Sequence, residues 1–118
     1  QRTELSNSDT LYQIPVENFF SILSVSLNPE KVNGELIKGC FVFNNKKQIQ
    51  AIIRNQVLEI SSDFEDKSCD FIVSTEEIIF KEVLAGLKGP IKTLGAGEME
   101  MKKGNSVAFL TYLSKFTD

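Results

Sequence analysis

The side chains that most often perform chemistry are scarce in this sequence. It contains no histidine, the usual general acid–base near neutral pH and a common metal ligand. The 118-residue chain therefore cannot build a Ser-His-Asp triad, a Cys-His pair or a zinc site that includes imidazole. Its two cysteines, Cys40 and Cys69, are too few for an all-cysteine zinc site. Most hydrolase and metalloenzyme mechanisms are thus closed to this chain acting alone.

The remaining reactive groups have structural explanations. The pair Glu76-Glu77 lies where a helix is expected to start, and Glu98 and Glu100 share one face of an expected strand. Gly95-Ala96-Gly97 has the glycine spacing that begins some phosphate-binding loops, yet it precedes a strand instead of opening a helix. We therefore expect no carboxylate catalysis, no nucleotide site and no cofactor.

The charge and hydropathy of the chain bear on whether it binds nucleic acid or spans a membrane. Sixteen acidic residues against thirteen basic ones give a net charge of −3, which leaves no positive surplus to neutralise nucleic-acid phosphates. The lysine pairs at 46–47 and 102–103 fall in or beside expected turns, where solvated charges are more common than a binding patch. No apolar run approaches the roughly 20 residues of a membrane span. We expect no nucleic-acid partner and no transmembrane segment.

Both cysteines lie in apolar, strand-like runs. The favoured interpretation is two buried free thiols that act as small apolar side chains. A disulfide between them is the alternative, which the sequence does not require. The localisation, cytoplasmic or exported, stays undecided.

The elements that must position any site follow from apolar periodicity. Helical spacing predicts a first helix over residues 14–27, and a short turn is expected near 29–33. Alternation with hairpin-length breaks then predicts three meandering strands, over 36–44, 48–54 and 57–61.

The second half of the chain predicts strand, helix, strand and helix. A strand over 69–74 leads to a helix that Thr75 caps and that ends at Gly86; a strand over 98–102 leads to a last helix, capped by Ser106 and extending to Phe116. Residues 1–10 are polar and aperiodic, so we expect a tail or linker there and a single domain over 11–118. The fold class is α+β, with one mixed sheet of about five strands and helices on one face.

All three long helices carry more apolar surface than one sheet face can cover. The second helix has Ile78, Ile79 and Phe80 in succession, and the last has the adjacent pairs Phe109-Leu110 and Tyr112-Leu113. Helix-on-helix packing, an apolar ligand cavity or a partner surface would each account for this surplus.

Several local patterns combine into a familiar arrangement. Ser74-Thr75 ends a strand, the next helix reaches Leu84-Ala85-Gly86, and Gly104-Asn105 precedes a closing apolar helix. In the first half, a helix over 14–20 that continues to Leu27 is followed by strands near 41–43 and 52–58. From Leu11 onward the chain resembles the sterol-carrier-protein-like fold, and more closely its version at the C-terminus of the alkyl sulfatases.

The resemblance implies a non-catalytic module that binds a lipid or alkyl chain and helps to gather aliphatic substrate for a sulfatase-type hydrolase. The implied ligand is a hydrophobic small molecule: a fatty acid, an alkyl sulfate or a lipid. The histidine-rich metal site and central dimerisation region of alkyl sulfatases have no counterpart here, so catalysis does not transfer. We expect a fragment or accessory of such an enzyme, with a covalently linked catalytic domain. The alternative is a structural or docking domain that uses its surplus apolar surface, for example to form a homodimer.

The resemblance places an apolar cavity between sheet and helices. Its expected lining comes from three helices, with two methionines as adaptable filler: Phe19, Leu23, Ile79, Val83, Met99, Met101, Phe109 and Tyr112. Each of these side chains would also suit an ordinary core. For a charged headgroup the candidate donors are Arg54 and Lys102, although both are expected to be solvated.

Overall fold

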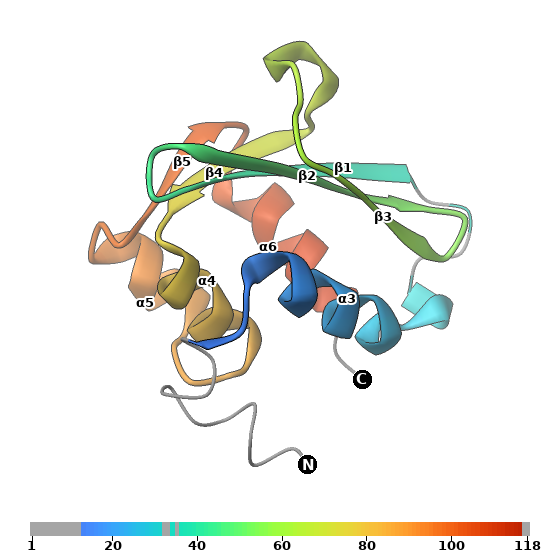
Figure 1. Cartoon of the computed structure of the whole chain (residues 1–118), viewed down its shortest axis with the longest axis horizontal. Helices are drawn as coiled ribbons and strands as arrows, with labels where there is room; N and C mark the ends of the chain where they lie inside the picture. The colour runs from blue at the N-terminus through green and yellow to red at the C-terminus, as the bar shows by residue number, and fades with distance from the viewer. Residues whose placement is uncertain (1–12, 32–33, 35, 117–118) are drawn as a thin grey trace.

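The computed structural model describes residues 13–31, 34 and 36–116. The expected tail over residues 1–10 lies outside this range. The described elements form two layers, a five-stranded sheet and a group of helices that covers one of its faces (Figure 1). The predicted α+β class, with one mixed sheet, is confirmed.

The sheet combines a meander with a crossover. Its strand order is β3-β2-β1-β4-β5. Antiparallel pairing joins β1 to β2, β2 to β3 and β4 to β5, whereas β4 pairs with β1 in parallel. The strands are β1 (Leu36–Phe43), β2 (Lys47–Arg54), β3 (Val57–Ser61), β4 (Phe71–Thr75) and β5 (Met99–Lys103).

Two tight hairpins fix the register of the meander. Asn44 and Asn45 between β1 and β2, and Asn55 and Gln56 between β2 and β3, have positive φ values of 54–68°. Two consecutive residues with positive φ are typical of the type I′ turn, whose twist matches that of the paired strands, and asparagine tolerates this conformation better than most residues.

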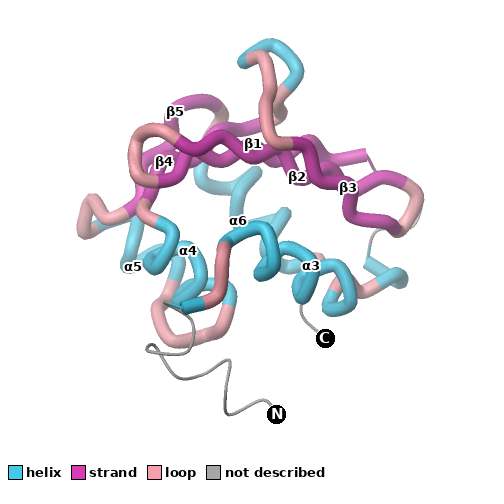
Figure 2. Tube along the Cα trace, in the orientation of Figure 1, coloured by secondary structure: helices cyan, strands magenta, loops and turns pink. Residues whose placement is uncertain are grey.

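The α-helices lie on the same side of the sheet, while a loop between β3 and β4 rises from the other side (Figure 2). That loop contains the short 3₁₀ helix η2. The helical elements are α3 (Val16–Ser26), η1 (Pro29–Lys31), η2 (Asp66–Ser68), α4 (Glu77–Leu84), α5 (Pro90–Gly95) and α6 (Ser106–Ser114). We did not predict α5, where we expected only a connection; Pro90 occupies its first turn, a position that suits proline.

Two predicted helix caps are wrong by one residue. Glu76 is the N-cap of α4, and the Thr75 hydroxyl instead donates to the Glu98 carbonyl at 2.8 Å. In α6 the N-cap is Asn105, whose side-chain oxygen accepts from the Ala108 N–H at 3.0 Å. Thr75 is the last residue of β4, and its hydroxyl bonds the chain just before β5. The N-cap position of α4 therefore falls on the next residue, Glu76.

Aromatic rings fill the space between the sheet and the helices. Phe41, on β1, is fully buried at the centre. Six rings surround it at centroid distances of 4.9–6.4 Å: Phe20, Phe43, Phe71, Phe80, Phe109 and Tyr112. The buried Tyr112 hydroxyl donates a hydrogen bond to the Ala51 carbonyl of β2 at 3.0 Å. This packing ties α6 to the sheet at the centre of the main core.

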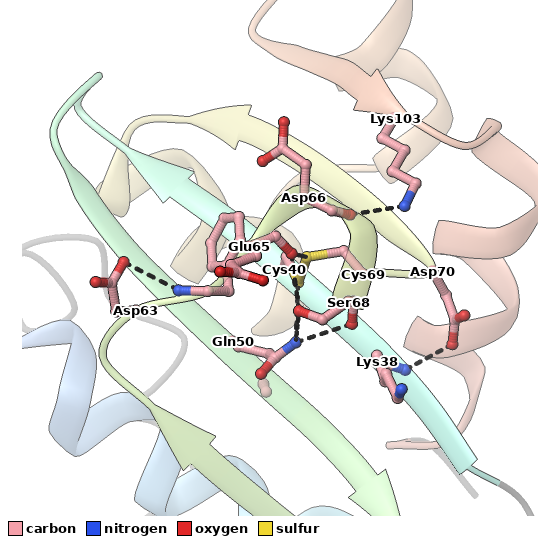
Figure 3. The surroundings of a disulfide bond; sticks show 12 residues. Lys38, Cys40, Gln50, Asp63, Glu65, Asp66, Ser68, Cys69, Asp70 and Lys103 are labelled. Atoms are coloured by element: carbon pink, nitrogen blue, oxygen red, sulfur yellow. Dashed lines mark hydrogen bonds between the residues drawn. A yellow bond between two sulfur atoms is a disulfide. The ribbon is translucent and has the colours of Figure 1, made fainter.

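The outer face of the sheet carries a disulfide between Cys40 on β1 and Cys69 just before β4 (Figure 3). The favoured interpretation of two free thiols is therefore wrong. The bond holds the η2 loop over the sheet, where Cys40, Cys69 and Ile72 form a small second core with Val42 and Phe64 packed against it. The face that we expected to be solvated is partly covered.

Hydrogen bonds fasten the same loop along its length, as Figure 3 shows. The buried Gln50 amide donates to the Ser68 carbonyl at 3.1 Å. The Lys103 ammonium donates to the Asp66 carbonyl at 2.7 Å, and the Lys38 backbone N–H donates to the Asp70 carboxylate at 2.8 Å. The loop is thus joined to β1, β2 and β5 by contacts that are distant in sequence.

Candidate functional site

The helix layer contains an apolar pocket of about 270 Å³. Its wall comes from α3, α4, α5, α6 and Phe116 after α6, and the described strands contribute no residue to it. The lining residues are Leu23, Ser26, Val83, Leu84, Pro90, Leu110, Leu113, Ser114 and Phe116. The pocket therefore lies among the helices, whereas the resemblance placed a cavity between helices and sheet.

Adjacent apolar side chains on α6 explain how the pocket forms. Phe109 and Tyr112 are buried in the main core, whereas the next residue after each, Leu110 and Leu113, lines the pocket and is half-buried. Neighbouring positions on a helix are about 100° apart, so one helix can serve two apolar surroundings. The surplus apolar surface of this helix is divided between the sheet and the pocket.

Burial varies along the pocket wall and defines its depth. Leu23, Val83 and Phe116 are buried and form the floor. Ser26, near the end of α3, and Ser114, at the end of α6, are exposed and form part of the rim. An aliphatic chain would contact leucine, valine and phenylalanine inside and leave its polar end near the serines.

The rim at Ser114 is held by two lysines. The Lys31 ammonium donates to the Ser114 carbonyl at 3.3 Å, and the Lys115 ammonium donates to the Lys31 carbonyl at 2.9 Å. The Asn28 N–H donates to the Lys115 carbonyl at 2.8 Å. These bonds fix the end of α6 against η1 and place positive charge at the negative end of the α6 dipole.

The structure distributes the eight residues expected to line a cavity over three surroundings. Leu23 and Val83 line the pocket. Four belong to the buried main core, namely Phe19, Met99, Phe109 and Tyr112. Ile79 and Met101 are half-buried and pack against that core. A binding role for these residues remains a prediction.

Sequence reasoning missed most of the pocket wall. The sequence does mark Leu110 and Leu113, because each directly follows an aromatic residue that is buried in the main core. It does not mark Ser26, Pro90 or Ser114, since nothing local identifies a small or polar residue as part of a pocket rim.

The candidate headgroup donors lie elsewhere. Arg54, on β2, pairs with Glu59 at 3.3 Å, and Lys102, on β5, pairs with Glu100 at 3.3 Å. All four side chains are exposed, and none belongs to the pocket wall.

A second hollow, of about 750 Å³, lies beside the β1–β2 turn and is mainly lined by polar residues. Glu17 and Lys47 pair across it at 3.0 Å. The hydrogen bond between them lowers the pKa of Glu17 and raises the pKa of Lys47. Glu77 accepts from the Asn44 amide at 3.1 Å. These carboxylates are engaged in bonds that position the β1–β2 turn against α3 and α4.

On α4, Lys81 is buried. Its ammonium donates to the Ile14 carbonyl and lies 4.0 Å from the Glu77 carboxylate. Loss of hydration lowers the pKa of Lys81. The bond attaches the chain before α3 to α4.

Among residues 13–31, 34 and 36–116, no three His, Cys, Asp or Glu side chains are grouped as metal ligands. Over the same residues, no helix has the length and apolar character to cross a bilayer.

Comparison with known families decides the classification. The family described as "Alkyl sulfatase C-terminal" matches residues 4–118. The chain belongs to this alkyl sulfatase C-terminal family. A comparison with curated proteins finds no match.

Solved structures share the fold of this alkyl sulfatase C-terminal domain. The sec-alkylsulfatase Pisa1 from Pseudomonas sp. matches with a TM-score of 0.80 and 19% identity, over 89% of this chain and 17% of that one. A UbiJ-SCP2 ubiquinone synthesis protein matches at 0.64 and 10% identity, over 88% and 93% of the two chains. The palmitated SCP2L2 from Aedes aegypti matches at 0.56 and 15% identity, over 89% and 96%. The present chain thus spans about a sixth of the sulfatase and nearly all of the two smaller proteins.

Proposed function

We propose that this alkyl sulfatase C-terminal domain binds the aliphatic chain of a lipid or alkyl ester in the helix-layer pocket and performs no chemistry itself. The observation that carries the proposal is the pocket: its buried floor of Leu23, Val83 and Phe116 is apolar, and its rim carries hydroxyls. A bound aliphatic chain also accords with the palmitated state named for the SCP2L2 structure, which has the same fold.

The pocket volume sets the length of aliphatic chain that the pocket can hold. A methylene is close in size to a water molecule, whose share of liquid volume is about 30 Å³. A volume of about 270 Å³ therefore holds on the order of nine methylenes by the same measure. This lies just below the usual range for ligand pockets, and we expect a chain of medium length, or part of a longer one.

Such a ligand would bind with modest affinity. Each buried methylene contributes about 0.8 kcal/mol, so nine contribute roughly 7 kcal/mol before costs. Lost translational and conformational freedom offsets several kcal/mol of that gain. The few kcal/mol that remain correspond to dissociation constants in about the millimolar range.

Modest affinity suits recruitment within a larger protein. We infer that the domain presents alkyl substrate to a covalently linked catalytic domain, because tethering raises the effective concentration of a weakly held ligand. The length of the sec-alkylsulfatase relative to this chain supports the inference. So does the absence of histidine from this chain.

The test is titration of an environment-sensitive fluorescent fatty acid, with dodecyl sulfate and dodecanol as competitors below their aggregation concentrations. Leu113→Trp adds a bulky ring to the pocket wall and is expected to weaken binding at least tenfold. Ile60→Trp adds the same ring to β3, outside the pocket wall, and serves as the matched control.

Two results would contradict the proposal. One is saturable binding that Leu113→Trp and Ile60→Trp change equally. The other is no saturable binding together with a dimeric mass on size exclusion, which would favour the alternative of an assembly domain.

A further inference from the structure

The exposed side of the helix layer has an unusual surface. Residues 18–26, which include most of α3, and residues 106–114 of α6 contain no charged side chain. Helices on a protein surface normally carry charge opposite their apolar stripe. Here the outward positions hold serine, threonine and aliphatic residues.

Large aliphatic side chains are exposed beside the pocket. Val25 is 84% exposed and precedes the rim residue Ser26; Val107 is 66% exposed and lies one helical turn before the lining residue Leu110. On α5, Ile91 is 71% exposed and follows the lining residue Pro90.

Leu87, also exposed, lies three residues before Pro90. We call Val25, Leu87, Ile91 and Val107 the docking face. Each of them is a near neighbour in sequence of a residue that lines the pocket.

The helical and loop segments that carry the docking face contain lysines and no acidic residue. In the segments 18–26, 87–92 and 106–116, the charged residues are Lys88, Lys92 and Lys115. Lys88 lies 3.7 Å from Glu98, a pair in which both side chains are partly exposed. Glu82 of α4 lies next to the lining residue Val83 and is half-buried. A chain with a net charge of −3 thus carries lysines in the same segments as these exposed aliphatic residues.

We propose that the docking face binds the surface of an anionic amphiphile aggregate, a bilayer or micelle, and that the pocket takes its aliphatic chain from there. Aliphatic side chains insert at the boundary between headgroups and hydrocarbon, and lysines gain from anionic headgroups. The centres of protein–protein interfaces are instead enriched in aromatic residues, methionine and arginine. None of these types is among the four residues of the docking face.

The position of the pocket also supports a bilayer or micelle as the partner of the docking face. Its exposed rim residues, Ser26 and Ser114, lie in the segments 18–26 and 106–114, which contain no charged side chain. A chain that leaves an aggregate beneath this face would enter the pocket without crossing water. The delivery step rests on the proposed function, whereas the docking itself does not.

The test is flotation of the full chain with vesicles of phosphatidylglycerol and phosphatidylcholine in equal parts, compared with phosphatidylcholine alone. We expect binding to the anionic vesicles that weakens as salt rises. Ile91→Asp and Val107→Asp each place a carboxylate on the docking face and are expected to reduce vesicle partitioning at least tenfold. Val57→Asp is the matched control, because Val57 is 55% exposed on β3 at the edge of the sheet.

The outcomes separate docking from the pocket. Ile91→Asp and Val107→Asp should keep the binding of monomeric fluorescent fatty acid, while Leu113→Trp should lose that binding and still float with vesicles. If the fatty acid never binds but the vesicle pattern holds, the proposed function fails and the docking face stands. Equal flotation of all variants, an equal loss for Val57→Asp, or no flotation with a dimeric mass would overturn the proposal; the last result would assign the face to a second copy of the chain.

Discussion

Removal of the Cys40–Cys69 disulfide should lower stability by an amount that its position determines. The bond closes a segment with a sequence separation of 29 residues. Loop-closure entropy for that length predicts a loss of about 3–4 kcal/mol when the bond is absent, because the unfolded chain gains freedom. A domain of this size has a total stability of roughly 5–15 kcal/mol. The Cys40→Ala/Cys69→Ala variant is therefore expected to fold at 25 °C with little reserve.

Urea unfolding followed by far-ultraviolet circular dichroism measures this loss. With a slope of about 1.5–2 kcal/mol per molar urea, the midpoint should fall by about 2 M. The slope itself should rise slightly, since an unlinked chain exposes more surface on unfolding. Dithiothreitol should shift the wild type by a similar amount and leave the double variant unchanged.

The location of the bond supplies a second readout. The disulfide lies on the outer face of the sheet, and the pocket lies among the helices on the other side (Figures 1 and 3). Fatty-acid binding by the folded double variant should match that of the wild type. The explanation by loop-closure entropy would be refuted if the double variant and the reduced wild type each lost less than about 1 kcal/mol of stability, with both thiols of the reduced wild type shown to be free.

Three further changes test the core and the helix start. Gly39→Val should cost about 3 kcal/mol or more in urea unfolding, because even a Cβ there would lie 2.9 Å from the Phe71 and Tyr112 rings; unchanged stability would contradict this packing. Tyr112→Phe should cost about 1 kcal/mol at pH 7 by removing the bond to the Ala51 carbonyl. Burial raises the pKa of Tyr112 above the ordinary value of 10.0, so the contribution of its hydroxyl to stability is complete below pH 10 and falls as the pH rises further. Between pH 9 and 11 the wild type should therefore lose more stability than the phenylalanine variant. Equal losses would exclude this titration. Asn105→Ala should cost about 1 kcal/mol by removing the α6 cap, with Ser106→Ala near neutral as its control; the reverse order would show that Ser106 is the cap.

Much of the fold could be predicted because its signals are local. The alternation in β2 and the turn residues Asn55-Gln56 identify the second hairpin from a few neighbouring positions. Helical spacing identified α3, α4 and α6, with ends that differ by one or two residues. The caps of α4 and α6 were missed by one residue, because several neighbouring side chains are suited to cap a helix and only the local geometry selects one.

The candidate site was less accessible to sequence reasoning. The prediction assigned the surplus apolar residues to one cavity, whereas aromatic rings around Phe41 fill the space between sheet and helices. Whether Leu110 or Phe109 faces the core depends on the rotation of α6 against β1 and β4. That rotation is set by contacts such as the bond from Tyr112 to Ala51, 61 residues away.

The sequence by itself determined the α+β class and excluded histidine-dependent chemistry, because composition and short-range periodicity are properties of the chain before it folds. The tertiary structure alone decided the disulfide, since only the parallel pairing of β1 with β4 brings Cys40 beside the segment that contains Cys69. It also decided the pocket, whose wall joins residues from Leu23 to Phe116. Both features depend on distances between segments remote in sequence, which are fixed by the packing of the whole chain and not by any local pattern.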